Sequence, residues 1–133
     1  MSYLIDSDWV IDHLANVEEA TQLLSRLSQV GIAITAITYM EAYQGVLRSP
    51  IREGAEELLA AFVEEIPIIR FTPATARVCA SIREALKKQG KRVNSRALDL
   101  LNAATALEHD LTLVTRNLDD YEDIPGLKLY RSN

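Results

Sequence analysis

Apolar residues along this chain occur in two kinds of pattern, short runs and longer segments with helical spacing. The short runs predict strands at residues 3–6, 32–35, 66–71, 111–115 and 127–130. The longer segments predict helices at residues 8–15, 17–29, 38–47, 50–65, 73–90 and 96–109. Because strands that alternate with helices form βαβ units, we expect one α/β domain over residues 1–133. Its mainly parallel central sheet should be flanked by helices on both faces.

Three acidic residues interrupt these apolar segments. Asp6 ends the first expected strand, Glu41 lies in the apolar stretch after the second strand, and Asp99 lies in a helix whose neighbouring residues are nearly all apolar. A carboxylate in apolar surroundings is costly unless it is paired or binds a metal. Three such cases in one small domain indicate that the carboxylates meet around a hard cation.

A second polar segment, Thr115-Arg116-Asn117, follows the fourth expected strand as Asp6 follows the first. Ligand sites of parallel sheets lie beyond the carboxyl ends of the strands, so we expect the two positions to converge. Thr115 and Asn117 could supply oxygen atoms to a metal or to its bound water. Asn117 could equally cap the turn that follows it.

The candidate ligands are oxygen atoms only, which favours Mg²⁺ or Mn²⁺. The single cysteine, Cys79, excludes an intramolecular disulfide and a zinc site built mainly on thiolates, and we expect it in the core. Carboxylates that hold such ions usually serve phosphoryl chemistry. The reaction expected here is in-line hydrolysis of a phosphodiester.

The segments around Asp6 and Glu41 could also serve as helix N-caps instead of metal ligands. Ser7 or Asp8 could cap the helix after the first strand. Thr38 and Glu41 have the spacing of a capping box, which would place Glu41 near a helix N-terminus. Gly45 lies one turn beyond Glu41, and its cost in mid-helix, about 1 kcal/mol relative to Ala, indicates close approach of backbone or ligand.

Asp99 has a different structural alternative. It shares a helix face with Asn102, three residues on, and the two make a polar notch in an apolar helix. Arg96, one turn earlier, could pair with Asp99 and leave Asn102 as an incidental polar residue.

Net charge is −5 over 133 residues, but residues 83–96 carry +5 and the remainder −10. A basic strip beside an acidic remainder would suit a polyanion that approaches a cation-filled acidic pocket, although it could also be a solvated helix end and loop. The candidate contacts to such a polyanion are the basic residues Lys87, Lys88, Lys91, Arg92, Arg96 and Arg116.

The N-terminus runs directly into a strand pattern without a basic leader region, and no apolar run could span a bilayer. We therefore expect a cytoplasmic protein with no membrane segment.

Three segments resemble motifs of the PIN-domain ribonucleases, most closely the VapC-like toxins of bacterial toxin–antitoxin pairs. LIDSDWVI at residues 4–11 is similar to the family's opening strand with its first Asp. ITYMEAYQG at residues 37–45 is similar to the second motif, with its Glu and later Gly. DLLNAATALEH at residues 99–109, followed by LTLVTRN at 111–117, is similar to the third-Asp helix and the Thr-Arg-Asn strand end. The resemblance covers essentially the whole chain.

The chain departs from the family pattern at a few positions. The family often has Thr-Asn where this chain has Ser7-Asp8, an aliphatic residue at Asn102 and a Gly at Asp110. Its fourth acidic position falls at Asn117, which leaves a second metal open. Asp120, three residues later, is a candidate substitute.

The resemblance implies a Mg²⁺- or Mn²⁺-dependent endoribonuclease with Asp6, Glu41 and Asp99 as metal ligands. Thr115 and Asn117 would orient water or the scissile phosphate. It also implies a homodimer, structured RNA such as tRNA as substrate, and a small antitoxin whose basic residue enters the acidic pocket.

Two other functions remain as alternatives. Asn117 favours a non-catalytic PIN-like module for RNA binding or dimerisation, with a degraded metal site. The Asp6-Ser7-Asp8 sequence after a strand also resembles the Asp-x-Asp motif of haloacid-dehalogenase-like phosphatases, but no later lysine and acidic-pair motif follows it.

Overall fold

The computed structural model of this protein describes residues 2–131, so residues 1, 132 and 133 of the expected domain lie outside the described part. It contains a five-stranded sheet with the order β3-β2-β1-β4-β5, in which every pairing is parallel. The strands are β1 (Tyr3–Ile5), β2 (Ile32–Thr35), β3 (Ile68–Ile69), β4 (Thr112–Val114) and β5 (Lys128–Leu129). The predicted α/β class with a parallel sheet is thus confirmed.

The chain winds outward from β1 in both directions. It passes first to β2 and β3 and later to β4 and β5, so the winding direction reverses between β1 and β4. Tyr3 is in register with Ile32 on one side and with Thr112 on the other. The carboxyl ends of β1 and β4 therefore lie side by side, at the point where such sheets place their ligand sites.

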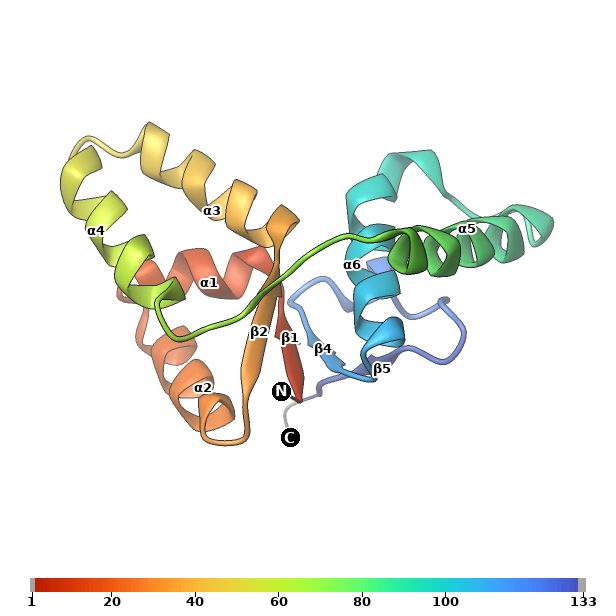
Figure 1. Cartoon of the computed structure of the whole chain (residues 1–133), viewed down its shortest axis with the longest axis horizontal. Helices are drawn as coiled ribbons and strands as arrows, with labels where there is room; N and C mark the ends of the chain where they lie inside the picture. Colours follow the sequence, from red (N-terminus) through yellow and green to blue (C-terminus); the bar gives the residue numbers. More distant parts are fainter. Residues whose placement is uncertain (1, 132–133) are drawn as a thin grey trace.

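Helices cover both faces of the sheet. They are α1 (Ser7–Leu14), α2 (Glu18–Ser28), α3 (Ala36–Arg48), α4 (Arg52–Val63), α5 (Pro73–Lys88) and α6 (Ala97–Glu108). Figure 1 shows α1 to α4 together on one side of the sheet and α5 and α6 on the other. Two short 3₁₀ helices, η1 (Asn94–Arg96) and η2 (Leu118–Asp120), lie next to α6 and β4 in the chain. In the described part of the chain, none of the helices is both long enough and apolar enough to cross a membrane.

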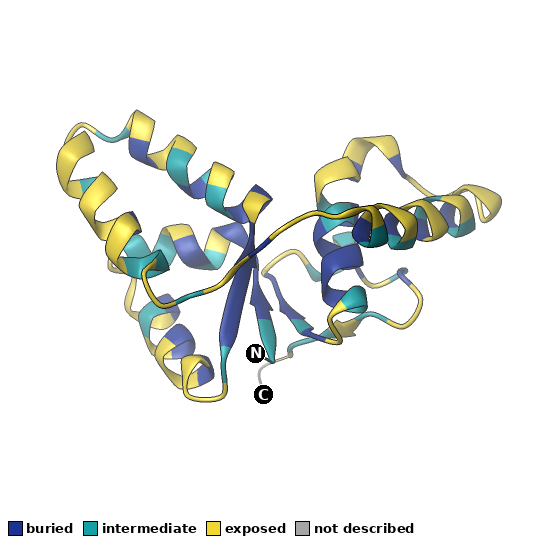
Figure 2. Ribbon diagram, viewed as in Figure 1, coloured by how far each residue is buried: buried dark blue, intermediate teal, exposed yellow. Residues whose placement is uncertain are grey.

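Two hydrophobic cores lie on opposite faces of the sheet, because successive strand side chains point in opposite directions. Leu4 and Leu113 enter the core beneath α5 and α6, whereas Ile5 and Val114 enter the core beneath α1 to α4. The inner strands β1, β2 and β4 are consequently buried along most of their length, whereas the edge strands β3 and β5 are more exposed (Figure 2). The first core also contains Cys79, which is buried as predicted.

The helix that carries Glu41 begins earlier than predicted. Its N-cap is Thr35, the last residue of β2, whose hydroxyl accepts a hydrogen bond from the Thr38 backbone N–H at 3.2 Å. The capping box expected at Thr38 and Glu41 is therefore wrong, since Thr38 lies inside the helix and is buried. The strand passes directly into α3 because Thr35 both ends the buried strand and caps the helix.

Arg96 is buried, with 4% of its surface exposed. Its guanidinium makes two 2.7 Å hydrogen bonds to the Asp123 carboxylate and donates to the backbone oxygens of Arg92 and Asp120. The alternative in which Arg96 pairs with Asp99 is therefore wrong, and so is the expected RNA contact of Arg96, because its side chain is buried. Its role is to tie the start of α6 to the loop that follows η2.

This ion pair makes stability depend on Asp123. Its hydrogen bonds with Arg96 lower the pKa of the Asp123 carboxyl, so the stability that it contributes is present above its unfolded pKa. That contribution is lost as pH falls through the lower, folded pKa. Asp123→Asn should reduce the free energy of unfolding by about 2–3 kcal/mol at pH 7, because it leaves the buried guanidinium unpaired.

Urea unfolding at pH 7 and near pH 3 would measure this difference, which should shrink at the lower pH. The matched control is Asp119→Asn, which changes an exposed acid in the neighbouring helix η2 and should have little effect. An Asp123→Asn variant as stable as the parent at pH 7 would contradict the assigned role.

Candidate active site

The Asp6 carboxylate lies at the carboxyl end of β1 and is held at both oxygens. It is 6% exposed, Oδ1 accepts from the Ser7 backbone N–H at 2.8 Å, and Oδ2 accepts from the Thr115 hydroxyl at 2.7 Å. Asp6 is thus the N-cap of α1, a role that the sequence had assigned to Ser7 or Asp8. A carboxylate is favoured at a helix N-terminus, so this capping role is compatible with a metal site.

Glu41 in α3 and Asp99 in the first turn of α6 are half-buried beside Asp6. Burial raises the pKa of all three carboxyl groups. The negative charge of Asp99 raises the pKa of both Asp6 and Glu41, and Asp8 acts in the same direction. Three carboxylates from three separate elements therefore repel one another at this edge of the sheet.

Two buried polar contacts hold the helices that carry these acids. The Thr35 hydroxyl donates to Asn102 Oδ1 at 2.6 Å, which joins the start of α3 to α6. The Tyr121 hydroxyl donates to Asp99 Oδ1 at 3.1 Å. Burial and the neighbouring acids Asp6 and Asp99 raise the pKa of Tyr121 far above its usual range, so its hydroxyl remains a donor.

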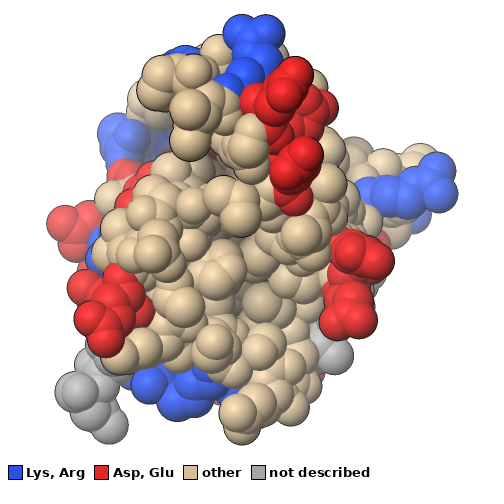
Figure 3. Space-filling model, turned by 90° about the vertical axis from the view of Figure 1, so that its left-hand side faces the viewer, with Lys and Arg blue, Asp and Glu red and all other residues tan. Residues whose placement is uncertain are grey.

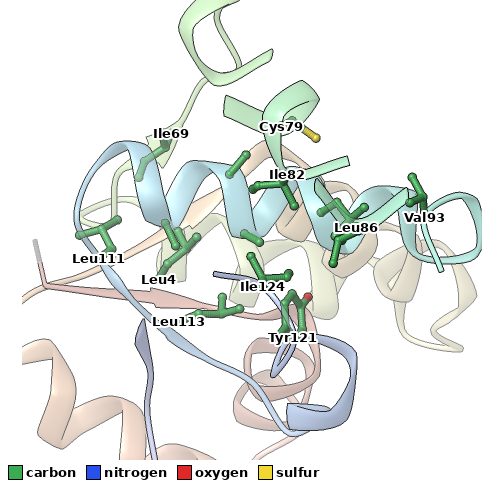
Figure 4. Close-up of a cluster of buried hydrophobic side chains, with 14 of the residues drawn as sticks. Leu4, Ile69, Cys79, Ile82, Leu86, Val93, Leu111, Leu113, Tyr121 and Ile124 are labelled. Atoms are coloured by element: carbon green, nitrogen blue, oxygen red, sulfur yellow. The ribbon is translucent and has the colours of Figure 1, made fainter. Parts of the chain in front are cut away.

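Sequence reasoning did not identify Thr35 and Tyr121, and it treated Asn102 only as part of a polar notch. Thr35 ends a buried strand as Asp6 and Thr115 do, and that shared position is the signal that could have identified it. Tyr121 carries no comparable signal, because its contact with Asp99 depends on the path of the loop after η2. Figure 4 shows Tyr121 in the apolar cluster with Leu4 and Leu113.

The segment after β4 supplies further polar contacts at the same edge. Besides holding Asp6, the Thr115 hydroxyl accepts from the Asn117 backbone N–H at 3.1 Å. The Asn117 side chain donates to Asp8 Oδ2 at 3.2 Å. Asn117 lies at the N-cap position of η2, but its side chain does not cap that helix, so the predicted capping role is wrong.

The donor set fits a hard divalent cation. Asp6, Glu41 and Asp99 offer oxygen atoms only, and their mutual repulsion is the kind that a bound cation relieves. In residues 2–131, no three acidic, histidine or cysteine side chains gather as closely as a ready-formed metal cage requires. A cation would therefore draw these side chains closer when it binds.

Asp120, the candidate fourth acid, faces the same cluster and raises the pKa of Asp99. It is joined to Arg92 by an ion pair of 2.9 Å. This ion pair would have to open before Asp120 could bind a metal or Arg92 could contact RNA. The two predicted roles therefore depend on each other.

The remaining predicted RNA contacts differ in their surroundings. Lys87 and Lys88 end α5, Lys91 follows it, and all three are exposed. Arg116 forms ion pairs with Asp12 of α1 at 2.9 Å and Glu19 of α2 at 3.5 Å, and it stacks on the ring of Trp9 in α1.

A parallel sheet with carboxylates at its carboxyl edge belongs to the class of α/β domains whose ligand site lies at that edge. Within that class, residues 3–127 match the family model of the PIN domain. The chain belongs to the PIN-domain family. This match also sets aside the phosphatase alternative drawn from Asp6 and Asp8.

Relatives of known name support the same family. The chain is 26% identical over 128 residues to the tRNA(fMet)-specific endonuclease VapC of Shigella flexneri, covering 96% of each protein. It is 32% identical over 98 residues to Ribonuclease VapC2 of Rickettsia felis, covering 74% of this chain and 72% of that protein.

Solved structures show the same fold. The crystal structure of VapBC2 from Rickettsia felis, bound to a DNA fragment from its promoter, matches with a TM-score of 0.85 and 26% identity over the full length of both chains. DNA-bound VapBC from Salmonella typhimurium matches with a TM-score of 0.85 and 25% identity, covering 98% of this chain and 97% of that one.

The raised carboxyl pKa values predict how Asp99 affects stability. A carboxyl whose pKa is raised by folding favours the folded protein below its unfolded pKa, and this stability is lost as pH rises through the folded pKa. Asp99→Asn in EDTA should therefore raise the free energy of unfolding at pH 7 by less than about 1 kcal/mol, because solvent screens a half-buried charge. Near pH 3 the Asp99 carboxyl of the parent is as neutral as the amide of the variant, so the difference in the free energy of unfolding should disappear.

Thermal melts with added Mn²⁺ test the metal-binding part of the same assignment. The parent should gain stability with rising Mn²⁺ concentration until the site is saturated, and Asp99→Asn should gain far less. Asp119→Asn, an exposed acid in η2, is the matched control and should respond like the parent. Equal stabilisation of the parent and Asp99→Asn by Mn²⁺ would contradict a metal role for Asp99.

Proposed function

We propose that this protein is a metal-dependent endoribonuclease that acts as the toxin of a toxin–antitoxin pair. The observation that carries the proposal is the convergence of Asp6, Glu41 and Asp99 at the carboxyl edge of a PIN-domain sheet. The names of the similar proteins, VapC ribonucleases and VapBC complexes, support both parts of it. The cytoplasm, where RNA substrates are found, is its proposed location.

Asp6, Glu41 and Asp99 would hold Mg²⁺ or Mn²⁺. The chemistry that such an ion supplies when bound is activation of a water molecule and neutralisation of phosphate charge. Around it, Thr115 keeps the Asp6 carboxylate in one orientation and Tyr121 does the same for Asp99. Asn117 would orient the attacking water or the scissile phosphate.

A cleavage assay on total tRNA and other structured RNA tests the function, with Mg²⁺, Mn²⁺ or EDTA. Cutting should require the metal and should fall below detection in Asp99→Asn, which also excludes a contaminating nuclease. Asp6→Asn should behave in the same way while the protein remains folded. An Asp99→Asn variant that cuts RNA like the parent would contradict the proposal.

The non-catalytic alternative rests on Asn117 at the fourth acidic position. Absence of cutting with a broad set of RNAs, together with a parent that Mn²⁺ does not stabilise, would favour this alternative over the endoribonuclease.

The exposed basic residues at the end of α5 and in the loop before α6 form the proposed RNA track, Lys87, Lys88, Lys91 and Arg92. This segment leads into η1 and α6, the helix that carries Asp99, so the bound backbone would pass next to the site. Phosphate contacts release counterions, which makes the affinity for RNA depend on salt concentration.

Charge reversal along the track should weaken RNA binding and flatten its salt dependence, most strongly when all four residues are reversed. The double variant Lys87→Glu/Lys91→Glu tests the track. Its control is Arg48→Glu/Arg52→Glu, which reverses two exposed charges outside the track, on α3 and α4. Binding would be measured in the Asp99→Asn background to prevent cleavage. An unchanged salt slope in the Lys87/Lys91 variant would exclude the track.

The proposed antitoxin site is an apolar groove of about 190 Å³ between α1, α3 and α4. It is lined mainly by small and aliphatic side chains, among them Ile11, Ala42, Gly45, Val46 and Leu58. Leu58 is 54% exposed, and nothing lies within 4 Å of the position that a Cβ on Gly45 would occupy. The close approach of backbone expected at Gly45 is therefore wrong for residues 2–131, and we propose that the partner fills this space.

The charge distribution on this side of the molecule suits a partner with an apolar face. Figure 3 shows a hollowed, mostly uncharged centre with acidic and basic side chains around its edge. A basic residue of the bound antitoxin would neutralise the nearby acidic cluster and so inhibit the enzyme. A homodimer, which the family resemblance implies, stays a prediction that sedimentation would test.

Leu58→Glu should abolish association with the antitoxin, because it places a charge in the apolar groove, and it should leave RNA cleavage unchanged. Val30→Glu, at an equally exposed apolar position outside the groove, is the control. Co-purification with a small antitoxin protein that is co-expressed with each variant would measure the effect. Retention of the antitoxin by Leu58→Glu would place its binding site elsewhere.

A further inference from the structure

Arg116 lies between two residues of the candidate site, yet its guanidinium contacts two helices. Nη2 donates to Asp12 Oδ2 in α1 at 2.9 Å, and Nη1 lies 3.5 Å from Glu19 Oε1 in α2. The guanidinium carbon lies 3.7 Å from the centroid of the Trp9 ring. A single side chain therefore joins the segment after β4 to α1 and α2.

The chain neighbours of Arg116 make the polar contacts of the site. Thr115 donates to Asp6 Oδ2 at 2.7 Å, and Asn117 donates to Asp8 Oδ2 at 3.2 Å. The Thr115 hydroxyl also accepts from the Asn117 backbone N–H. Displacement of Arg116 would therefore move both side chains relative to the carboxylates.

Apart from these hydrogen bonds, the described segment lies outside regular structure. It follows the last residue of β4, and both Arg116 and Asn117 are exposed. Exposed segments outside regular structure are the parts of a protein that open most easily. A side chain that anchors such a segment to two helices reduces this freedom at the place where the geometry of the site is set.

The contacts suit arginine in particular. A flat guanidinium can stack on an indole ring and still direct N–H groups from its edge to carboxylates, whereas a lysine ammonium cannot do both. Two carboxylates already compensate the charge of Arg116, and its side chain is 32% exposed. An RNA phosphate would have to displace these partners before it could use this arginine.

We propose that Arg116 is a positioning residue, clamped on Trp9, Asp12 and Glu19, which holds Thr115 and Asn117 against Asp6 and Asp8. The clamp fixes the orientation of the Asp6 carboxylate and of the Asn117 amide in the active site. This role rests on the endoribonuclease function proposed above, and it replaces direct contact with RNA as the task of Arg116.

The test compares Arg116→Gln with the parent in RNA cleavage kinetics. Misplacement of site residues lowers turnover, so kcat should fall about tenfold to a hundredfold while KM stays within about twofold. Arg116→Lys keeps the positive charge but loses the guanidinium that stacks on Trp9. Its kcat should lie between those of Arg116→Gln and the parent. The matched control is Arg48→Gln, because Arg48 is exposed and makes no side-chain hydrogen bond or ion pair with other described residues.

Variants of Trp9 separate the stacking from the ion pairs. Trp9→Phe keeps an aromatic face, and it also removes an indole N–H that is buried without a hydrogen-bond partner within residues 2–131. It should therefore retain kcat close to the parent. Trp9→Leu removes the face and should lower kcat in the same direction as Arg116→Gln.

Amide hydrogen exchange at Asn117 provides a readout that does not need activity. Loss of the clamp should increase exchange of this amide in Arg116→Gln by about tenfold or more, while amides in the core strands remain protected. If the parent cleaves no RNA, the proposed function fails, but this measurement still decides whether the clamp exists. Unchanged exchange at Asn117 would overturn the clamp whatever the activity.

Kinetic outcomes of a different form would also overturn the proposal. A raised KM, a salt slope of RNA binding reduced by about one, and an unchanged kcat would make Arg116 a phosphate contact. Unchanged kcat and KM in Arg116→Gln would show that the ion pairs and the stack do not position the site.

Discussion

The buried charge of Asp6 is the constraint on which the rest of this structure depends. It lies at the carboxyl end of the central strand β1, where an isolated carboxylate would cost several kcal/mol. Two hydrogen bonds, from the Ser7 backbone and the Thr115 hydroxyl, compensate part of that cost. The same edge then receives Glu41 and Asp99, whose charges raise the cost again. Under the proposed function, a divalent cation would satisfy all three acids together.

The two cores and a few buried polar contacts bring these acids to one place. Leu4 and Ile5 anchor β1 in opposite cores, so the position at which Asp6 leaves the sheet is fixed from both faces. The contact between Thr35 and Asn102 fixes the start of α3 against α6, and with it the separation of Glu41 and Asp99. The ion pair between Arg96 and Asp123 closes the loop that carries Tyr121 over α6. Each contact lies away from the expected chemistry, yet each sets the geometry of the site.

The sequence was sufficient for the fold class and for the acids of the candidate site, because both are encoded in local patterns. Strands and helices follow from apolar spacing, and Asp6, Glu41 and Asp99 stand out because each interrupts an apolar segment. The residue roles that could not be predicted depend on contacts between residues far apart in the sequence. Thr35 and Asn102 are 67 residues apart, and Arg96 was assigned to a basic strip because its partner, Asp123, follows 27 residues later. The N-cap role of Asp6 was missed because strand and helix meet there without an intervening turn.

The most direct measurement of the central claim is anomalous diffraction from a crystal of this protein that contains Mn²⁺. The account predicts a strong anomalous peak between the carboxylates of Asp6, Glu41 and Asp99, with the three side chains drawn toward it, and no such peak in Asp99→Asn. The absence of a peak at this edge of the sheet in the parent, under conditions where Mn²⁺ is in excess, would contradict the view that these three acids converge in order to bind a metal.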